Sequence, residues 1–133
     1  MHDADLRPNA ANHAPLTPVI FLERAADVYP ERMAVVHGGV RRTWSETRAR
    51  CHRLASALLR HGLRAGDVVS VMLPNVPAMV EAHFGVPMAG LVLNTLNTRL
   101  DSEALSYMLA HARTRAVLVD PEFGAAMRRA MEG

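Results

Sequence analysis

Residues 68–94 read VVSVMLPNVPAMVEAHFGVPMAGLVLN, and this stretch decides the fold class. The run at 68–74 is rich in β-branched residues and has almost no polar alternation, which is typical of a strand covered on both faces. A helix-forming segment follows, with Pro77 in its first turn, and a second apolar run begins at Leu91. The order strand, helix, strand predicts a β-α-β unit with parallel strands.

The helix inside this stretch has recognisable ends. We expect Asn75 to cap it. Pro87 cannot donate a backbone hydrogen bond to the carbonyl of His83, so the helix should kink or end there, with Gly90 just beyond. Its apolar face is expected to hold Met79, Val80, His83 and Phe84.

The same alternation continues downstream. The short strand LVLN at 91–94 leads into a polar turn, and Asp101 can cap the next helix. AVLVD at 116–120 is the third predicted strand and is apolar as a buried strand is, and Pro121 is expected to open a last helix. Three strands that alternate with three helices imply right-handed crossovers and a parallel sheet with helices on its faces.

Upstream of the β-α-β units, the pattern predicts a helix and a β-hairpin. Thr17 and Pro18 supply a cap and a first-turn proline, and the helix should run to Val28. Its apolar positions are Ile20, Phe21, Ala25 and Val28. The run at 33–44, MAVVHGGVRRTW, has adjacent glycines that suit a two-residue hairpin turn.

A capping box predicts where the next helix begins. Thr43 and Glu46 have the T-x-x-E spacing in which each side chain bonds to the backbone of the other residue. Gly62 should end this helix. Its apolar face is expected to hold Thr47, Cys51, Leu54, Ala55, Leu58 and Leu59.

Composition restricts the function classes. The chain has 133 residues, half of them hydrophobic, which suits one globular domain. Its formal net charge is only +2, and every basic residue is Arg, since the sequence contains no Lys. This excludes a P-loop lysine or a Schiff-base lysine from the chain. With Cys51 as the single cysteine, no internal disulfide can form.

The sequence shows neither a secretion signal nor a segment that would span a membrane. The first residues carry early acids and no apolar core of a secretion signal, so we expect a cytoplasmic protein. The longest uncharged run, 82–98, is broken by Pro, Gly and Asn, so we expect no membrane span.

Common catalytic and ligand motifs do not occur. The sequence has no GxxxxGK[ST] loop, no GxGxxG loop after a strand and no GxSxG elbow. The seven histidines show no metal-ligand spacing with Cys51, so we predict no metal site. Ser70 is interpreted as a hydrogen-bonded sheet serine. His83 is interpreted as a partly buried histidine bonded to backbone, with a catalytic role as the weaker alternative.

One cluster of arginines could suggest a phosphate-binding patch. Its members are spread around the predicted helix, and Trp44 is the only nearby aromatic that could stack on bases. A solvated face is therefore favoured over a nucleic-acid surface. The cluster comprises Arg48, Arg50, Arg53, Arg60 and Arg64.

Two long stretches carry a resemblance to a known family. They read RRTWSETRARCHRLASALLRHGLRAGDVVSVMLPNVPAMVEAHFGVPMAGLVLNTLNTRL (41–100) and LSYMLAHARTRAVLVD (105–120). In order and spacing they resemble the N-terminal part of the AMP-forming acyl-CoA synthetases, within the adenylate-forming superfamily. EAHFGVPMAG is most similar to the branch that activates short- to medium-chain fatty or related carboxylic acids.

The resemblance implies a parent reaction. Family members join a carboxylic acid to ATP, release diphosphate and pass the acyl group to CoA, with Mg²⁺ at the nucleotide. They use a Lys-containing phosphate loop and a second Lys on a mobile C-terminal domain. No position here matches those groups, so we expect no catalytic or cofactor-binding residue in this chain and no activity by the chain alone.

The resemblance also implies a partial fold. Residues 1–16 are expected to form a flexible tail, and 17–133 an incomplete N-terminal subdomain whose sheets later segments complete. Our first hypothesis is a truncated acyl-CoA synthetase that pairs with the rest of the enzyme or with itself. The alternative is a stand-alone or complementing α/β binding module without enzymatic activity.

The polar turn NTLNTRL at 94–100 is the last candidate. Asn and Thr side chains readily bond nearby backbone, so a structural connection between strand and helix explains most of this turn. Asn97 and Arg99 stay weaker candidates, together with His83, for contacts to a substrate or to a missing segment.

Overall fold

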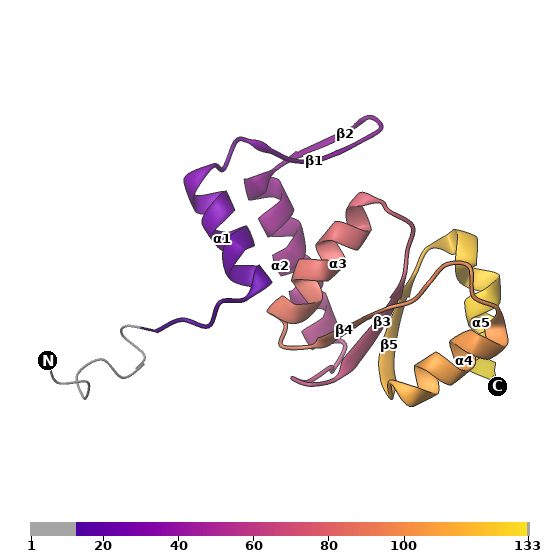
Figure 1. Cartoon of the computed structure of the whole chain (residues 1–133). Coiled ribbons are helices and arrows are strands. Elements are labelled where there is room, and N and C mark those ends of the chain that lie inside the picture. Colours follow the sequence, from indigo (N-terminus) through magenta and orange to yellow (C-terminus); the bar gives the residue numbers. More distant parts are fainter. Residues whose placement is uncertain (1–12, 133) are drawn as a thin grey trace, which may run out of the picture.

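A computed structural model of the chain describes residues 13–132 (Figure 1). The buried run of the opening stretch forms β3 (Val68–Met72), the central strand of a three-stranded parallel sheet. β4 (Val92–Thr95) and β5 (Thr114–Val119) flank it, giving the order β4-β3-β5. The predicted α/β class with parallel β-α-β units is confirmed.

The remaining elements follow the predicted order. A helix and a two-stranded antiparallel hairpin precede the sheet, as expected. The bounds are α1 (Pro18–Val28), β1 (Met33–His37), β2 (Val40–Thr43), α2 (Trp44–Arg60), α3 (Pro77–Met88), α4 (Ser102–His111) and α5 (Gly124–Glu132).

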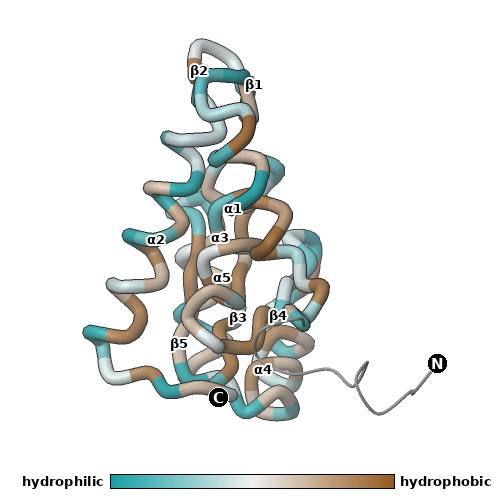
Figure 2. Tube along the Cα trace, turned by 90° about the vertical axis from the view of Figure 1, so that its left-hand side faces the viewer, coloured by the Kyte–Doolittle hydropathy of each residue, from teal (hydrophilic) through white to brown (hydrophobic). Residues whose placement is uncertain are grey.

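Helices cover both faces of the sheet, because β3 is apolar on both sides. Val69 and Val71 are fully buried against α2 and α3, where Leu58, Ala82 and Val86 complete a first cluster. The second cluster, on the opposite face, holds Met72, Leu96, Leu105, Met127 and Ala130 from β3, the turn after β4, α4 and α5. In Figure 1 the strands run between α2 and α3 on one side and α4 and α5 on the other. In Figure 2, β3 is coloured mostly as hydrophobic.

Local signals account for most helix ends. The capping box at Thr43 and Glu46 is present in both directions, at 3.2 Å and 2.8 Å. Gly62 and Gly90 follow the ends of α2 and α3 with φ of +87° and +74°, a backbone region that favours glycine. α3 ends one residue after Pro87, as expected from its missing donor.

Several predicted boundaries differ from those in the structure. Val76 is the capping residue of α3, with no side-chain bond, so Asn75 does not cap it. Pro121 opens a short 3₁₀-helix (Pro121–Phe123) that precedes α5, because the carboxylate of Asp120 accepts from the N–H of Glu122. β5 also begins before the predicted strand, at Thr114.

Three predicted helix faces need correction. α3 buries Glu81, Ala82, Gly85 and Val86, whereas Val80 and His83 are exposed. In α1, Phe21 and Val28 are exposed and Leu22 and Ala26 are buried. Leu59 of α2 is exposed, although Thr47, Cys51, Ala55 and Leu58 are buried as predicted.

The predicted flexible tail, residues 1–16, lies mostly outside the described residues; within 13–16 the chain forms no helix or strand. Across residues 13–132, no helix is both long enough and apolar enough to cross a membrane.

Gly85 lies where α3 comes closest to Cys51 and Leu54 of α2. A Cβ atom on Gly85 would lie 3.0 Å from the carbonyl oxygen of Cys51 and 3.1 Å from the Cβ of Leu54. Gly85→Ala should therefore lower the free energy of unfolding by about 1–3 kcal/mol, despite the better helix propensity of Ala. Urea unfolding followed by circular dichroism measures this change.

Gly124→Ala is the matched control, because its Cβ would meet only the end of the Arg128 side chain at 3.5 Å. This variant should be neutral or slightly stabilised. Equal effects of the two substitutions would contradict the close approach of α2 and α3.

Candidate functional site

The carboxyl ends of β3 and β4 lie side by side at one end of the sheet. Open α/β sheets bind ligands at the carboxyl ends of their strands, where the strand order reverses; in the order β4-β3-β5 this point lies between β3 and β5. The sheet-edge groove lies at the carboxyl ends of β3 and β4. It is lined by Leu73, Pro74, Asn75, Met79, Thr95, Leu96, Asn97 and Thr98. The turn after β4 therefore brings Asn97, one of the predicted site residues, into this groove at the carboxyl ends of β3 and β4.

The polar turn itself is held by local hydrogen bonds. The side-chain oxygen of Asn97 accepts from the N–H of Arg99 at 2.9 Å, and Asp101 caps α4 through the N–H of Ala104 at 2.9 Å. Leu96 turns inward and is buried in the second cluster. The predicted structural connection is thus confirmed, and the side chains of Asn97 and Arg99 are exposed on it.

His83 lies apart from the groove's polar residues. Its ring Nδ1 is 2.8 Å from the carbonyl oxygen of Met79, so the predicted bond to backbone is confirmed. The predicted partial burial of His83 is wrong. α3 packs on the sheet through Ala82 and Val86, and His83 lies on the exposed side of the helix.

Ser70 is the polar centre of the sheet. Its hydroxyl lies 2.7 Å from the hydroxyl of Thr114 on β5 and accepts from the side-chain amide of Asn94 on β4 at 2.9 Å. The side chain is fully buried, and these bonds satisfy it. The interpretation as a hydrogen-bonded sheet serine is confirmed.

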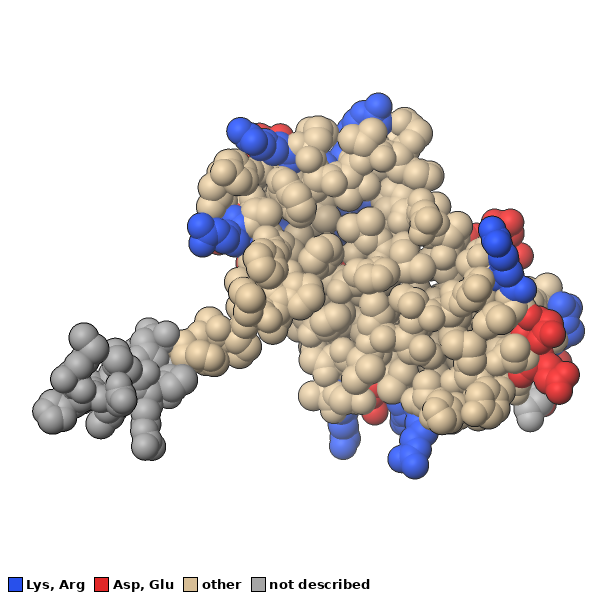
Figure 3. All heavy atoms as spheres, viewed as in Figure 1, with Lys and Arg blue, Asp and Glu red and all other residues tan. Residues whose placement is uncertain are grey.

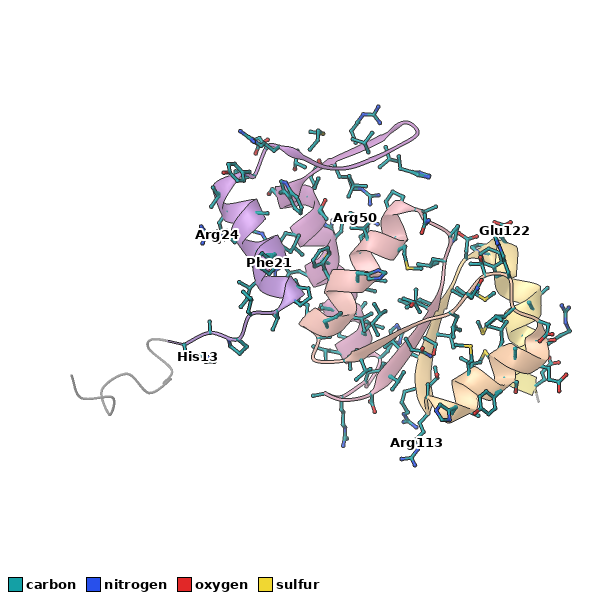
Figure 4. All side chains as sticks on the ribbon, viewed as in Figure 1. His13, Phe21, Arg24, Arg50, Arg113 and Glu122 are labelled. Carbon is teal, nitrogen blue, oxygen red and sulfur yellow. The ribbon has the colours of Figure 1, made fainter. Side chains whose placement is uncertain are left out.

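The sequence reasoning missed a buried ion cluster around Glu81. This carboxylate on α3 is 7% exposed and meets two guanidinium groups. Arg50 of α2 donates to its Oε1 at 2.6 Å, and Arg42 of β2 donates to the same oxygen. Figure 4 places Arg50 between α2 and α3, near the hairpin. The cluster therefore joins the hairpin and α2 to α3.

A signal for Glu81 was present in the sequence. It is the only acidic residue between Asp67 and Asp101, and it lies in a helix whose other residues, apart from His83, are apolar. A carboxylate in such a place is stable when a cation pairs with it. Its partners lie 31 and 39 residues away in sequence, so periodicity alone could not identify them.

The charge of Glu81 also influences its neighbours. The hydrogen bond to Glu81 raises the pKa of the Arg50 guanidinium. Burial, with the Glu81 charge adding to it, raises the pKa of the Cys51 thiol to about 11. A thiol that stays protonated at neutral pH is a poor nucleophile, and Cys51 packs as a small core residue, as predicted.

Arg53 of the predicted cluster lines one groove with Arg50, Arg41 and Arg42, whereas Arg48 and Arg60 have other partners. Arg48 pairs with Asp27 at 2.5 Å and Arg60 donates to the Ser56 hydroxyl at 2.9 Å, both on exposed surface. On the face shown in Figure 3, charged side chains lie mainly at the rim and uncharged ones cover the middle.

Within residues 13–132, no three His, Cys, Asp or Glu side chains are placed to hold a metal ion. The sheet-edge groove contains amide and hydroxyl side chains and lacks the lysine of a phosphate loop.

Comparisons with known proteins give one consistent result. The family described as "AMP-binding enzyme" matches residues 22–132. The chain is 51% identical over 119 residues to acetate–CoA ligase CCL3 of Humulus lupulus, covering 90% of this chain and 21% of that protein. It is 46% identical over 127 residues to a peroxisomal benzoate–CoA ligase of Arabidopsis thaliana, covering 96% of this chain and 22% of that protein.

Solved structures agree with the sequence comparison. A benzoate CoA ligase from Burkholderia xenovorans superposes with a TM-score of 0.83 at 26% identity. The match covers 86% of this chain and 24% of that one. The chain thus spans about a fifth of the length of the curated relatives it matches.

Glu81→Gln tests the ion cluster. The substitution removes the charge that balances Arg42 and Arg50 while keeping the shape, so the free energy of unfolding should fall by about 2 kcal/mol or more. Urea unfolding at low and high salt measures the loss. Asp27→Asn, which removes an exposed partner of Arg48, is the control and should leave the midpoint unchanged. Tolerance of Glu81→Gln would contradict a stabilising cluster.

The structural roles of the Asn97 and Arg99 side chains can be compared through the unfolding free energies of their alanine variants. Asn97→Ala removes the side-chain acceptor of the turn and should cost about 0.5–1 kcal/mol in unfolding free energy. Arg99→Ala keeps the backbone donor and should change stability by less than about 0.5 kcal/mol, since its side chain is exposed. A larger loss for Arg99→Ala would mean that this arginine has a structural role.

Proposed function

Because this chain belongs to the AMP-binding enzyme family, we propose that it is the N-terminal part of an acyl-CoA ligase that converts a carboxylic acid, ATP and CoA to acyl-CoA, AMP and diphosphate. The observation that carries the proposal is the match of residues 22–132 to the family, together with about 50% identity to a CoA ligase. In the complete enzyme, ATP, CoA and Mg²⁺ would be bound mainly by the other four fifths of the protein.

We further propose that the chain alone does not catalyse the reaction. Adenylyl transfer needs positive groups and metal ions around the reacting phosphate. The sequence has no Lys, and its sheet-edge groove offers amides and hydroxyls instead. No reaction step can therefore be assigned to a side chain of this part.

The acid is proposed by class only. Relatives are named for acetate and benzoate, which supports a short or aromatic carboxylic acid. The prediction of a cytoplasmic protein stays a prediction, and the name of the Arabidopsis thaliana relative points to peroxisomes as the alternative compartment.

Asn97 and Arg99 are the residues proposed to contact a substrate or the rest of the enzyme. Both are exposed in the turn after β4, Asn97 lines the groove there, and an exposed guanidinium such as that of Arg99 is well suited to an anionic group. His83 is a weaker candidate, because it faces solvent and its Nδ1 is bonded to the Met79 carbonyl.

The second candidate function is a stand-alone or complementing binding module. Two buried apolar clusters on opposite sides of β3 support it, since they give the part a core of its own. Stable monomeric behaviour and tight binding of a free acid, without any adenylation, would favour this candidate over the ligase.

The enzymatic proposal predicts an absence of activity that can be measured. The purified chain, prepared from a host strain without its own acyl-CoA synthetases, should show no acetate- or benzoate-dependent exchange of pyrophosphate into ATP. An intact CoA ligase assayed in parallel provides the positive control. Exchange above background by the chain alone would refute the proposal that it is inactive by itself.

A further inference from the structure

A groove rich in arginine lies between the hairpin and α2, and the proposed function gives it no role. This arginine groove is lined by Arg41, Arg42, Glu46, Ala49, Arg50 and Arg53, among others. Residues 46, 49, 50 and 53 share one face of α2 by their helical spacing. The other two arginines come from β2, so spacing along the helix could not reveal the grouping. The arginine groove has no lining residue in common with the sheet-edge groove.

The buried carboxylate of Glu81 fixes two of the four guanidinium groups. Nε of Arg50 donates to Oε1 of Glu81 at 2.6 Å, and Nη1 of Arg42 donates to the same oxygen. A guanidinium has five N–H donors, so both groups keep donors that Glu81 does not use. The side chains of Arg42 and Arg50 are 22% and 41% exposed. Two guanidinium groups are therefore held close together, with donors left over for a ligand.

The arginine groove carries more positive charge than its acids balance. Glu81 alone serves two guanidinium groups. The second acid, Glu46, accepts at 2.8 Å from a backbone N–H in the capping box. Arg41 donates to two neutral backbone carbonyls of the hairpin, and Arg53 is exposed. Four guanidinium groups thus stand against two carboxylates, which leaves positive charge for an anion from outside.

The length of the groove favours an anion with two phosphate groups. Arginine binds phosphate oxygens through paired N–H donors. Residues 46–53 extend about 10 Å along α2, at 1.5 Å per residue, and the small side chain of Ala49 lies among the long ones. The hydroxyl of Ser45 adds a neutral donor. The backbone N–H groups of Trp44, Ser45 and Glu46 already have acceptors, so the side chains must hold the ligand.

We propose that the arginine groove is a binding site for a diphosphate group. The paired guanidinium groups of Arg42 and Arg50 bind one phosphate, and the exposed Arg53 binds the other. Free diphosphate and the diphosphate of a nucleotide such as ADP share this chemistry. The site does not depend on the proposed ligase function, because the residues proposed to contact a substrate lie in a different groove.

Titration calorimetry of the full chain with sodium diphosphate tests the proposal, in a buffer without phosphate or Mg²⁺. Binding should saturate at one diphosphate per chain. Arg53→Gln should weaken it by about tenfold or more, because a charge-assisted hydrogen bond is lost. Arg53 is exposed, so the variant should fold as the unaltered chain does. Absence of saturable binding at millimolar diphosphate would overturn the inference.

Arg60→Gln is the matched control. Arg60 is exposed on the same helix, about two turns beyond Arg53, and donates to the Ser56 hydroxyl outside the arginine groove. The variant removes the same charge and should bind diphosphate as the unaltered chain does. Equal weakening in both variants would overturn the inference, because net charge alone would then attract the anion.

A second measurement locates the ligand. In ¹⁵N-labelled chain, diphosphate should shift the side-chain Nε–H resonances of Arg50 and Arg53 and leave the backbone amides of Asn97 and Thr98 in place. Shifts centred on Asn97 and Thr98 would overturn the inference, because they would place the anion in the sheet-edge groove.

ADP distinguishes the two sources of the diphosphate group. Tighter binding of ADP than of diphosphate, with the same dependence on Arg53, would support the site and identify a nucleotide as its ligand. Tighter binding of diphosphate would support the site and identify the free anion.

Discussion

The burial of β3 on both faces is the constraint on which the rest of the structure depends. A strand without polar alternation has apolar side chains on both faces, and both faces must be shielded from water. The chain therefore needs a helical layer on each side of the sheet. α2 and α3 cover one face with the first cluster, and α4 and α5 cover the other with the second. The one polar side chain inside β3, Ser70, is tolerated because β4 and β5 each supply a partner for it.

The Glu81 cluster is the second constraint, and it links two parts of the chain. The carboxylate of Glu81 on α3 holds one guanidinium from the hairpin and one from α2. A buried carboxylate needs its cationic partners, because removal of one partner leaves an uncompensated charge inside the protein. This fixes how the N-terminal elements lie on α3 and, through α3, on the sheet.

Local patterns predicted the elements well and the helix faces less well. The capping box at Thr43 and the proline at position 87 act within a few residues, so the sequence reveals them directly. α3 is apolar nearly all round, so its pattern does not say which side meets the sheet, and His83 was placed on the wrong side. The pairing of Glu81 with Arg42 depends on tertiary approach, which no local spacing encodes. The site candidates Asn97 and Arg99 were found because the turn is polar, but that polarity first serves the turn's own backbone.

The central claim is that this sheet is built around β3, with β4 and β5 as its outer strands within residues 13–132. Native-state hydrogen exchange of the chain alone tests this most directly. The account predicts that the amides of β3 exchange slowest, that Leu118 is protected by its bond to β3, and that Val117 and Val119 exchange quickly. Strong protection of Val117 and Val119 in a monomeric chain would contradict it.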